Sequence, residues 1–144
     1  MKMNQEKLIG TWEFVSCVAK TSTGEVNYPW GQDSSGLLTY TADGYVFVSR
    51  MSVALKEAAS KLVPGSQEEA LAVVAGFEAY SGKYTVKDNL VTHHVQMCST
   101  PVHCGTEQSR YFEFNGDEIS LTTKPVEFEG VTHTAYLVWR RVQP

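Results

Sequence analysis

The stretch 80-YSGKYTVKDNLVTHHVQM-97 decides the fold class of this chain. Two runs of alternating polar and apolar residues flank Lys87-Asp88-Asn89, which has the residue types of a hairpin turn. Successive side chains of a β-strand point to opposite faces, so the adjacent His93 and His94 cannot share a site on one face. Because His93 alternates with valines and His94 with polar residues, His93 is predicted to face the core.

The same pattern recurs along most of the chain, with a turn signal about every ten residues. Further alternating runs are TWEFVSCVAK, GLLTYTADGYVFVSR, QSRYFEFNGDEISLTT and VTHTAYLVWRRV. Roughly eight short strands in hairpin order predict an all-β fold, a closed up-and-down antiparallel β-barrel, since closure removes the sheet edges. A β-sandwich is the structural alternative.

One segment, residues 51–82, departs from this pattern and predicts two short helices separated by Pro64-Gly65. Ser66 and Glu69 have the spacing of a capping box at the start of the second helix. The helical pair is expected to cap one mouth of the barrel. Its apolar stripe of Leu71, Val74 and Phe77 suits either a plug that extends the core or a lid over a ligand cavity.

Length and composition indicate a single domain over residues 1–144. A hydrophobic content of 42% is ordinary for a globular protein, and a net charge of −4 argues against a nucleic-acid partner. The N-terminal stretch lacks a secretory h-region, and no window resembles a membrane span, so a cytoplasmic location without a membrane partner is expected. Three cysteines, an odd count, are expected to be reduced thiols.

Alternation on neighbouring strands predicts the lining of the barrel interior. Arg110 is the unusual member, because a buried guanidinium needs a partner and the neighbouring inward faces carry no acid. Glu57 and Glu78, from the predicted helical segment, are the candidate partners of Arg110 within the chain. The predicted ligand-binding residues are Phe47, Tyr80, Tyr84, His93, Met97, Gln108, Arg110 and Phe112, with Val95 and Leu121 as further lining.

The ordered set LIGTWEFVS, GLLTYTADGY, YSGKYTV, VTHHV, GTEQSRYFEFNGDEISLTT and LVWRR resembles the lipocalin-like domain family over Leu8 to Arg141. The resemblance implies a barrel of the calycin type around a small-molecule cavity. It further implies that Trp12 closes the barrel floor under an arginine of the last strand, either Arg141 or Arg140. An arginine stacked on an indole gains about 0.5–2 kcal/mol, and both residues are interpreted as structural.

Cys98, His103 and Cys104 lie where the chain departs from the family pattern. Their proximity to the paired histidines suggests zinc, but the chain has no C-x-x-C pair there, and His103 and Cys104 are adjacent. Free thiols on a loop, with neither a metal nor another cofactor, are therefore expected.

Three functions suit these residues. The leading hypothesis is binding of a small, mostly apolar or aromatic molecule with an acidic or enolic group, by a monomer or a homodimer. The second is an isomerase or cyclase in the same cavity, with His93 as general acid or base and Arg110 and Tyr84 stabilising an enolate. The third is a haem-binding barrel with an axial ligand such as His133.

Overall fold

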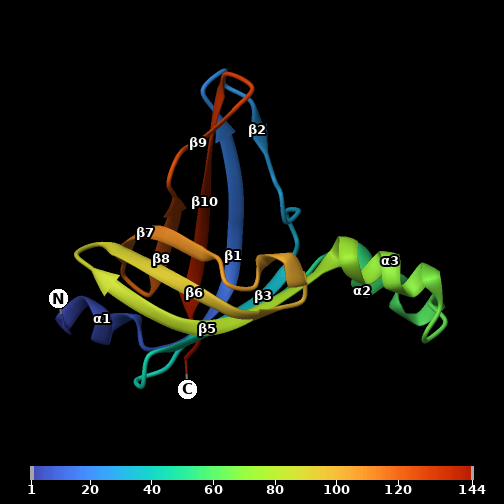
Figure 1. Cartoon of the computed structure of the whole chain (residues 1–144), viewed down its shortest axis with the longest axis horizontal. Coiled ribbons are helices and arrows are strands. Elements are labelled where there is room, and N and C mark those ends of the chain that lie inside the picture. The colour runs from blue at the N-terminus through green and yellow to red at the C-terminus, as the bar shows by residue number, and fades with distance from the viewer. Residues whose placement is uncertain (1, 144) are drawn as a thin grey trace.

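The computed structural model describes residues 2–143, with side chains from residue 4 onward, and consists mainly of β-strands (Figure 1). Three α-helices and two short 3₁₀ turns interrupt the strands. The helices are α1 (Lys2–Leu8), α2 (Val53–Ala58) and α3 (Gln67–Gly76), and the 3₁₀ turns are Ala59–Lys61 and Pro101–His103. The strands are β1 (Gly10–Thr21), β2 (Val26–Asn27), β3 (Ser35–Tyr40), β4 (Tyr45–Met51), β5 (Phe77–Lys87), β6 (Leu90–Cys98), β7 (Glu107–Asn115), β8 (Glu118–Thr123), β9 (Val126–Phe128) and β10 (Val131–Arg141).

The sheet closes on itself. Strands β3 to β8 pair antiparallel in sequence order, β8 pairs with β10, and β1 pairs with both β3 and β10. The short strands β2 and β9 lie outside this ring as additions to β1 and β10. The predicted closed antiparallel barrel is therefore confirmed, with eight strands in the ring, and the β-sandwich alternative is wrong.

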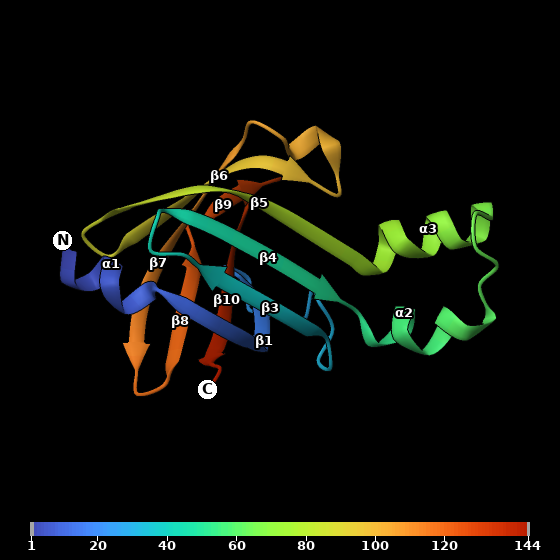
Figure 2. The same ribbon diagram turned by 90° about the horizontal axis from the view of Figure 1, so that it is seen from below.

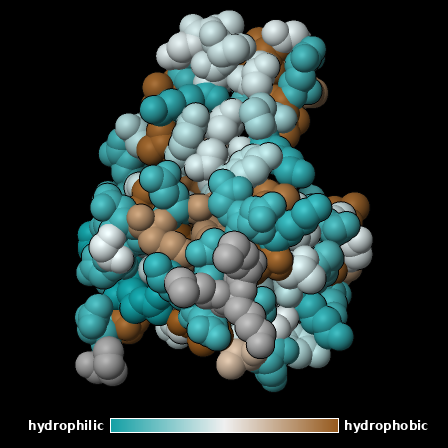
Figure 3. Space-filling model, turned by 90° about the vertical axis from the view of Figure 1, so that its left-hand side faces the viewer, coloured by the Kyte–Doolittle hydropathy of each residue, from teal (hydrophilic) through white to brown (hydrophobic). Residues whose placement is uncertain are grey.

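The barrel floor lies beside α1. The indole N–H of Trp12 donates to the carbonyl of Leu8 at 2.9 Å, and the guanidinium of Arg141 lies 4.1 Å from the centre of the indole ring. Arg141 also donates to the carbonyl of Ile9 at 2.9 Å, which ties the last strand to the entry of the first. Seen from the α1 side, the surface is mostly hydrophilic, with hydrophobic atoms in small groups (Figure 3).

A β-bulge in β6 changes which side chains face inward. Ser81 pairs with Met97 and Gly82 with Val95, so Gln96 is the extra residue. A Cβ atom at Gly82 would lie 1.8 Å from the carbonyl oxygen of His94, so only glycine allows the two strands to approach here. Beyond the bulge the alternation is reversed, and Cys98 packs against the core while Met97 is 64% exposed.

The helical pair α2 and α3 projects from the end of β4 and the start of β5 and does not cover the barrel (Figures 1 and 2). Ser66 caps α3 by accepting from the N–H of Glu69 at 3.1 Å, as predicted, and Glu69 accepts from the N–H of Gly65 at 2.8 Å. However, Leu71 is 64% and Val74 77% exposed, so the expected apolar stripe neither plugs nor lids a cavity. Of the helices in the described part of the chain, none has the length and apolar character to span a membrane.

Candidate ligand-binding site

The barrel encloses a cavity of about 180 Å³. Its walls come from the inner faces of the strands and from Trp30, which precedes β3. The apolar lining consists of Trp30, Leu38, Val48, Leu121, Leu137 and Trp139, and the polar lining consists of Glu78, Tyr80, His93, Gln108 and Arg110. Apolar and polar residues contribute about equally to the wall, and the polar groups are gathered on the neighbouring strands β5, β6 and β7. A concave site with convergent polar groups is a candidate small-molecule site.

His93 lies on the cavity wall and links two tyrosines. Its Nε2 atom is 2.7 Å from the hydroxyl of Tyr40, and its Nδ1 atom is 2.7 Å from the hydroxyl of Tyr80. Burial, and then the charge of Arg110, lower the pKa of His93 from 6.5 to about 3, so the ring is neutral at pH 7. A neutral imidazole has one donor and one acceptor nitrogen, so one tyrosine donates to His93 and the other accepts from it.

Both tyrosines are neutral as well. Burial raises the pKa of Tyr40 and of Tyr80 above the ordinary value of 10, and this effect exceeds the opposing influence of the Arg110 charge. The Tyr40–His93–Tyr80 chain is therefore an uncharged hydrogen-bond network inside the barrel.

Arg110 is the cationic group of the cavity. Its Nη1 atom donates to the carbonyl of Ser109 at 2.9 Å, and its Nη2 atom donates to Oε1 of Gln108 at 3.2 Å. Glu78 lines the same cavity, whereas Glu57 is exposed on α2. Neither forms an ion pair with Arg110, and among residues 4–143 no carboxylate lies within ion-pair distance of this guanidinium. Its charge is therefore available to a ligand.

A second recess adjoins the chamber. It has a volume of about 580 Å³, opens between β7 and β10, and includes Gln108, Arg110, Lys124 and His133. Because Gln108 and Arg110 line both spaces, they stand where the inner chamber meets the outer recess. His133, the residue considered as a haem ligand, lies in the outer recess and not in the inner chamber.

Two predicted lining residues face outward. Phe47 is 49% exposed because Val46 and Val48 occupy the inner face of β4, and Met97 is exposed because of the bulge at Gln96. With Leu37, they line an exterior depression of about 610 Å³. The prediction that Phe47 and Met97 line the interior is wrong.

Tyr84 and Phe112 do face inward but lie in the packed core. The hydroxyl of Tyr84 donates to the carbonyl of Thr41 at 2.9 Å, and Phe112 packs with Phe114 at 5.7 Å between ring centres. Neither borders the cavity. Only Tyr80, His93, Gln108 and Arg110 of the predicted set meet there, together with Leu121.

Sequence reasoning missed Tyr40, the partner of His93 across the barrel. Its signal was present, since Leu38 and Tyr40 alternate with polar or exposed positions in GLLTYT. Trp30 and Trp139 were missed for different reasons. Trp30 lies outside the strands, where alternation makes no prediction. Trp139 alternates with exposed residues in the last strand, but the predicted interior did not include that strand.

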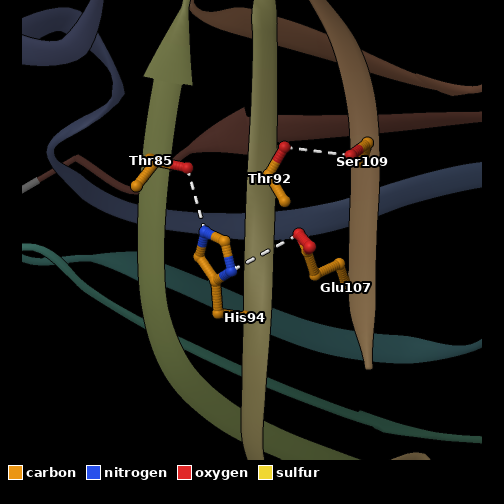
Figure 4. A network of polar contacts seen from close by, with 5 residues as sticks. All are labelled: Thr85, Thr92, His94, Glu107 and Ser109. Carbon is orange, nitrogen blue, oxygen red and sulfur yellow. Dashed lines mark hydrogen bonds and ion pairs between the residues drawn. The ribbon is translucent and has the colours of Figure 1, made fainter. Parts of the chain in front are cut away.

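His94 lies on the outer face of β6, beside Thr85 and Glu107 (Figure 4), and is not part of the cavity lining. Its Nε2 atom is 3.0 Å from Oγ1 of Thr85, and its Nδ1 atom is 3.7 Å from the carboxylate of Glu107 (Figure 4). On the next positions of the same face, the hydroxyls of Thr92 and Ser109 lie 2.9 Å apart. This surface network joins β5, β6 and β7 on the side opposite His93.

The cysteines are dispersed. Cys17 is buried, Cys98 is half-buried and Cys104 is exposed, and all three are free thiols. Burial raises the pKa of the Cys17 thiol. Within the described residues, no three His, Cys, Asp or Glu side chains are grouped so that they could hold a metal ion.

Fold and cavity together define a closed up-and-down β-barrel with an internal chamber. The chain belongs to the Lipocalin-like domain family, whose sequence profile matches residues 9–142. It is 32% identical, over 91 residues, to the 4′-hydroxy-3′-methoxypropiophenone carrier protein of Aspergillus oryzae, an alignment that covers 57% of this chain and 82% of that protein. A lipocalin-like protein from Bacteroides uniformis has a similar fold, with a TM-score of 0.50, 11% identity, and coverage of 94% of this chain and 98% of that chain.

Proposed function

We propose that this protein is a carrier that binds a small, mostly apolar aromatic molecule with an acidic or enolic oxygen inside the barrel. The observation that carries the proposal is Arg110, a cation that forms no ion pair with a carboxylate among the described residues, at the wall of a chamber that also has six apolar lining residues. A bound oxyanion would pair directly with Arg110 through charge-assisted hydrogen bonds, which Glu78, on the same chamber but beyond ion-pair distance, does not form.

The size of the chamber supports a ligand of this kind. A volume of about 180 Å³ suits a single substituted aromatic ring, and Trp30 and Trp139 offer aromatic surface to it. The curated relative is named as the carrier of a ring that bears a hydroxyl, a methoxy and a ketone group. Such a compound combines an apolar ring with the oxygens that Arg110 and Tyr80 would bind.

The surroundings of His93 favour a carrier over an isomerase or cyclase. Both ring nitrogens already have tyrosine partners at 2.7 Å, and a pKa of about 3 makes the ring a weak base. In a carrier, His93 organises the wall of the chamber. In an enzyme, it would have to exchange one of these hydrogen bonds for a substrate.

A dye titration tests the proposal. The protein should bind a naphthalene sulfonate dye saturably, and aromatic and medium-chain carboxylates should displace it. Circular dichroism and cooperative unfolding would show that the sample is folded. A folded protein that binds neither the dye nor a single-ring aromatic carboxylate, the latter followed by quenching of tryptophan fluorescence, would point to a purely structural barrel.

We also propose that this carrier acts in the cytoplasm, as a monomer or a homodimer. Three free cysteines suit a reducing compartment. Sedimentation measurements with and without a bound aromatic carboxylate would distinguish the two assembly states.

A further inference from the structure

The protons of the Tyr40–His93–Tyr80 chain have two possible arrangements. In the first, Tyr40 donates to Nε2 of His93, Nδ1–H donates to Tyr80, and the Tyr80 proton is left for another acceptor. In the second, Tyr80 donates to Nδ1, Nε2–H donates to Tyr40, and the Tyr40 proton is left over. Heavy-atom distances of 2.7 Å on both sides fit either arrangement.

The surroundings of the two hydroxyls differ. Tyr40 is 1% exposed, does not border the cavity, and has His93 as the one hydrogen-bond partner of its hydroxyl among the described residues. In the second arrangement its proton would be buried without an acceptor, which is unfavourable. Tyr80 lines the cavity, where water or a ligand can accept its proton. The first arrangement is therefore favoured.

Arg110 lines the same cavity as Tyr80 and His93. In the first arrangement, both the guanidinium N–H groups of Arg110 and the O–H of Tyr80 are donors on the chamber wall.

We propose that Tyr40 and His93 orient the Tyr80 hydroxyl as a donor, so that Tyr80 and Arg110 together select a ligand oxygen that only accepts hydrogen bonds, such as a ketone, enolate or phenolate. This inference rests on the proposed function and names the chemistry of the ligand atom. Tyr80 and Arg110 contact the ligand in this account, whereas Tyr40 and His93 are positioning residues.

Nitrogen-15 NMR of the histidine rings tests the tautomer without any ligand. The His93 signals are assigned by their loss in His93→Gln, and long-range couplings show which nitrogen carries the proton at pH 7. The expected result is a protonated Nδ1 and an unprotonated Nε2. A protonated Nε2, or an equal mixture of the two tautomers, would overturn the inference.

Ligand selection is tested with propiophenone and 1-phenylpropan-1-ol, which differ only in the reduction of the carbonyl. The wild-type protein should bind the ketone at least about tenfold more tightly, because neither Tyr80 nor Arg110 can accept the proton that the alcohol brings. Tighter binding of the alcohol would overturn the inference and indicate that Glu78, which lines the same chamber, accepts that proton. Tyr80→Phe and Tyr40→Phe should both bring the ratio of ketone affinity to alcohol affinity toward one. Tyr111→Phe on the outer face of the barrel is the matched control and should leave the ratio unchanged.

The outcomes separate the two proposals. Equal binding of ketone and alcohol would reject oxygen selection and leave small-molecule binding intact. Binding of neither compound, nor of the dye, would reject the proposed function, while the tautomer measurement would still decide the arrangement of the hydrogen-bond chain. If Tyr80→Phe lost the preference for the ketone and Tyr40→Phe kept it, the positioning role of Tyr40 would be rejected.

Discussion

His93 and His94 are adjacent in sequence and lie on opposite sides of the barrel wall. The side chain of His93 is 3% exposed and joins the hydroxyls of Tyr40 and Tyr80, whereas His94 is partly exposed and contacts Thr85 and Glu107 (Figure 4). One peptide bond thus separates a residue of the candidate site from a residue of the surface, which makes the pair a natural internal comparison.

Glutamine substitutions at these two positions should differ in their effect on stability. His94→Gln should change the free energy of unfolding by less than about 0.5 kcal/mol, as is usual at the surface. His93→Gln should lower it by about 1–3 kcal/mol, since a glutamine cannot bridge both tyrosine hydroxyls and one is left unpaired. Urea unfolding followed by tryptophan fluorescence measures both. Greater damage from His94→Gln would mean that the assigned register of β6 is wrong.

The stability of the protein should fall in mild acid because of His93. Its pKa is about 3 in the folded state, against an ordinary value of 6.5, so between these values the unfolded chain binds more protons. The contribution of His93 is complete above pH 6.5 and is lost as the pH falls toward 3, with a slope of at most about 1.4 kcal/mol per pH unit. Urea unfolding at pH 5.0 to 7.0 should show this slope in the wild type.

His93→Gln provides the comparison, because glutamine does not titrate. Its unfolding free energy should depend less steeply on pH between about pH 5 and 6.5, a range chosen to lie above the ordinary pKa values of carboxylic acids. The same slope in both proteins would show that His93 is not the titrating group.

Arg110→Met should weaken the binding of an anionic ligand while preserving the fold. The loss of a charge-assisted hydrogen bond is expected to reduce the affinity for an aromatic carboxylate by about 1.5–3 kcal/mol. Unfolding free energy should stay equal or rise, because no buried carboxylate among the described residues is paired with Arg110. Calorimetric titration and urea unfolding measure the two effects.

Arg140→Met is the matched control for this charge change. Arg140 pairs with Glu118 at 2.7 Å on the barrel exterior, so its replacement removes the same charge without touching the cavity. Ligand affinity should then remain near that of the wild type. A large loss of stability in Arg110→Met would instead indicate that Glu78 depends on the arginine.

Trp12→Ala should destabilise the barrel without changing which ligand it prefers. Trp12 is 1% exposed and contacts Arg141 at the floor, outside the lining of the cavity. Truncation of a buried tryptophan typically costs about 3–5 kcal/mol of stability. Thermal unfolding and competitive dye binding provide the measurements. A variant with normal stability and altered selectivity would refute a structural role for Trp12.

Local patterns were enough to predict the barrel and part of its interior. The alternation around His93 places its ring inside, and the hairpin turns specify antiparallel neighbours, because both depend on residues that are close in sequence. Tyr80, Gln108 and Arg110 were predicted to face inward for the same reason, and all three line the cavity. The capping box of Ser66 and Glu69 is likewise a local interaction.

Two errors in the predicted interior have identifiable physical causes. Both faces of β4 carry apolar residues, so periodicity alone could not show which face Phe47 occupies. Its pairing with Thr39 and Ser81 puts it on the outer face. Met97 lies after a bulge, which reverses the alternation on which the prediction depended. Gly82 was the local sign of that bulge, since a glycine inside a strand often marks the close approach of another backbone.

The sequence by itself determined the alternation of faces, the turns and the capped helix, because these follow from interactions within a few residues of each other. Only the tertiary structure decided that Tyr40 meets His93 from 53 positions away, that the helical pair projects from the barrel, and that Arg110 lacks a carboxylate partner among the described residues. These features depend on barrel closure, which sets the distances between strands that are remote in sequence and leaves the chamber in which His93 and Arg110 lie.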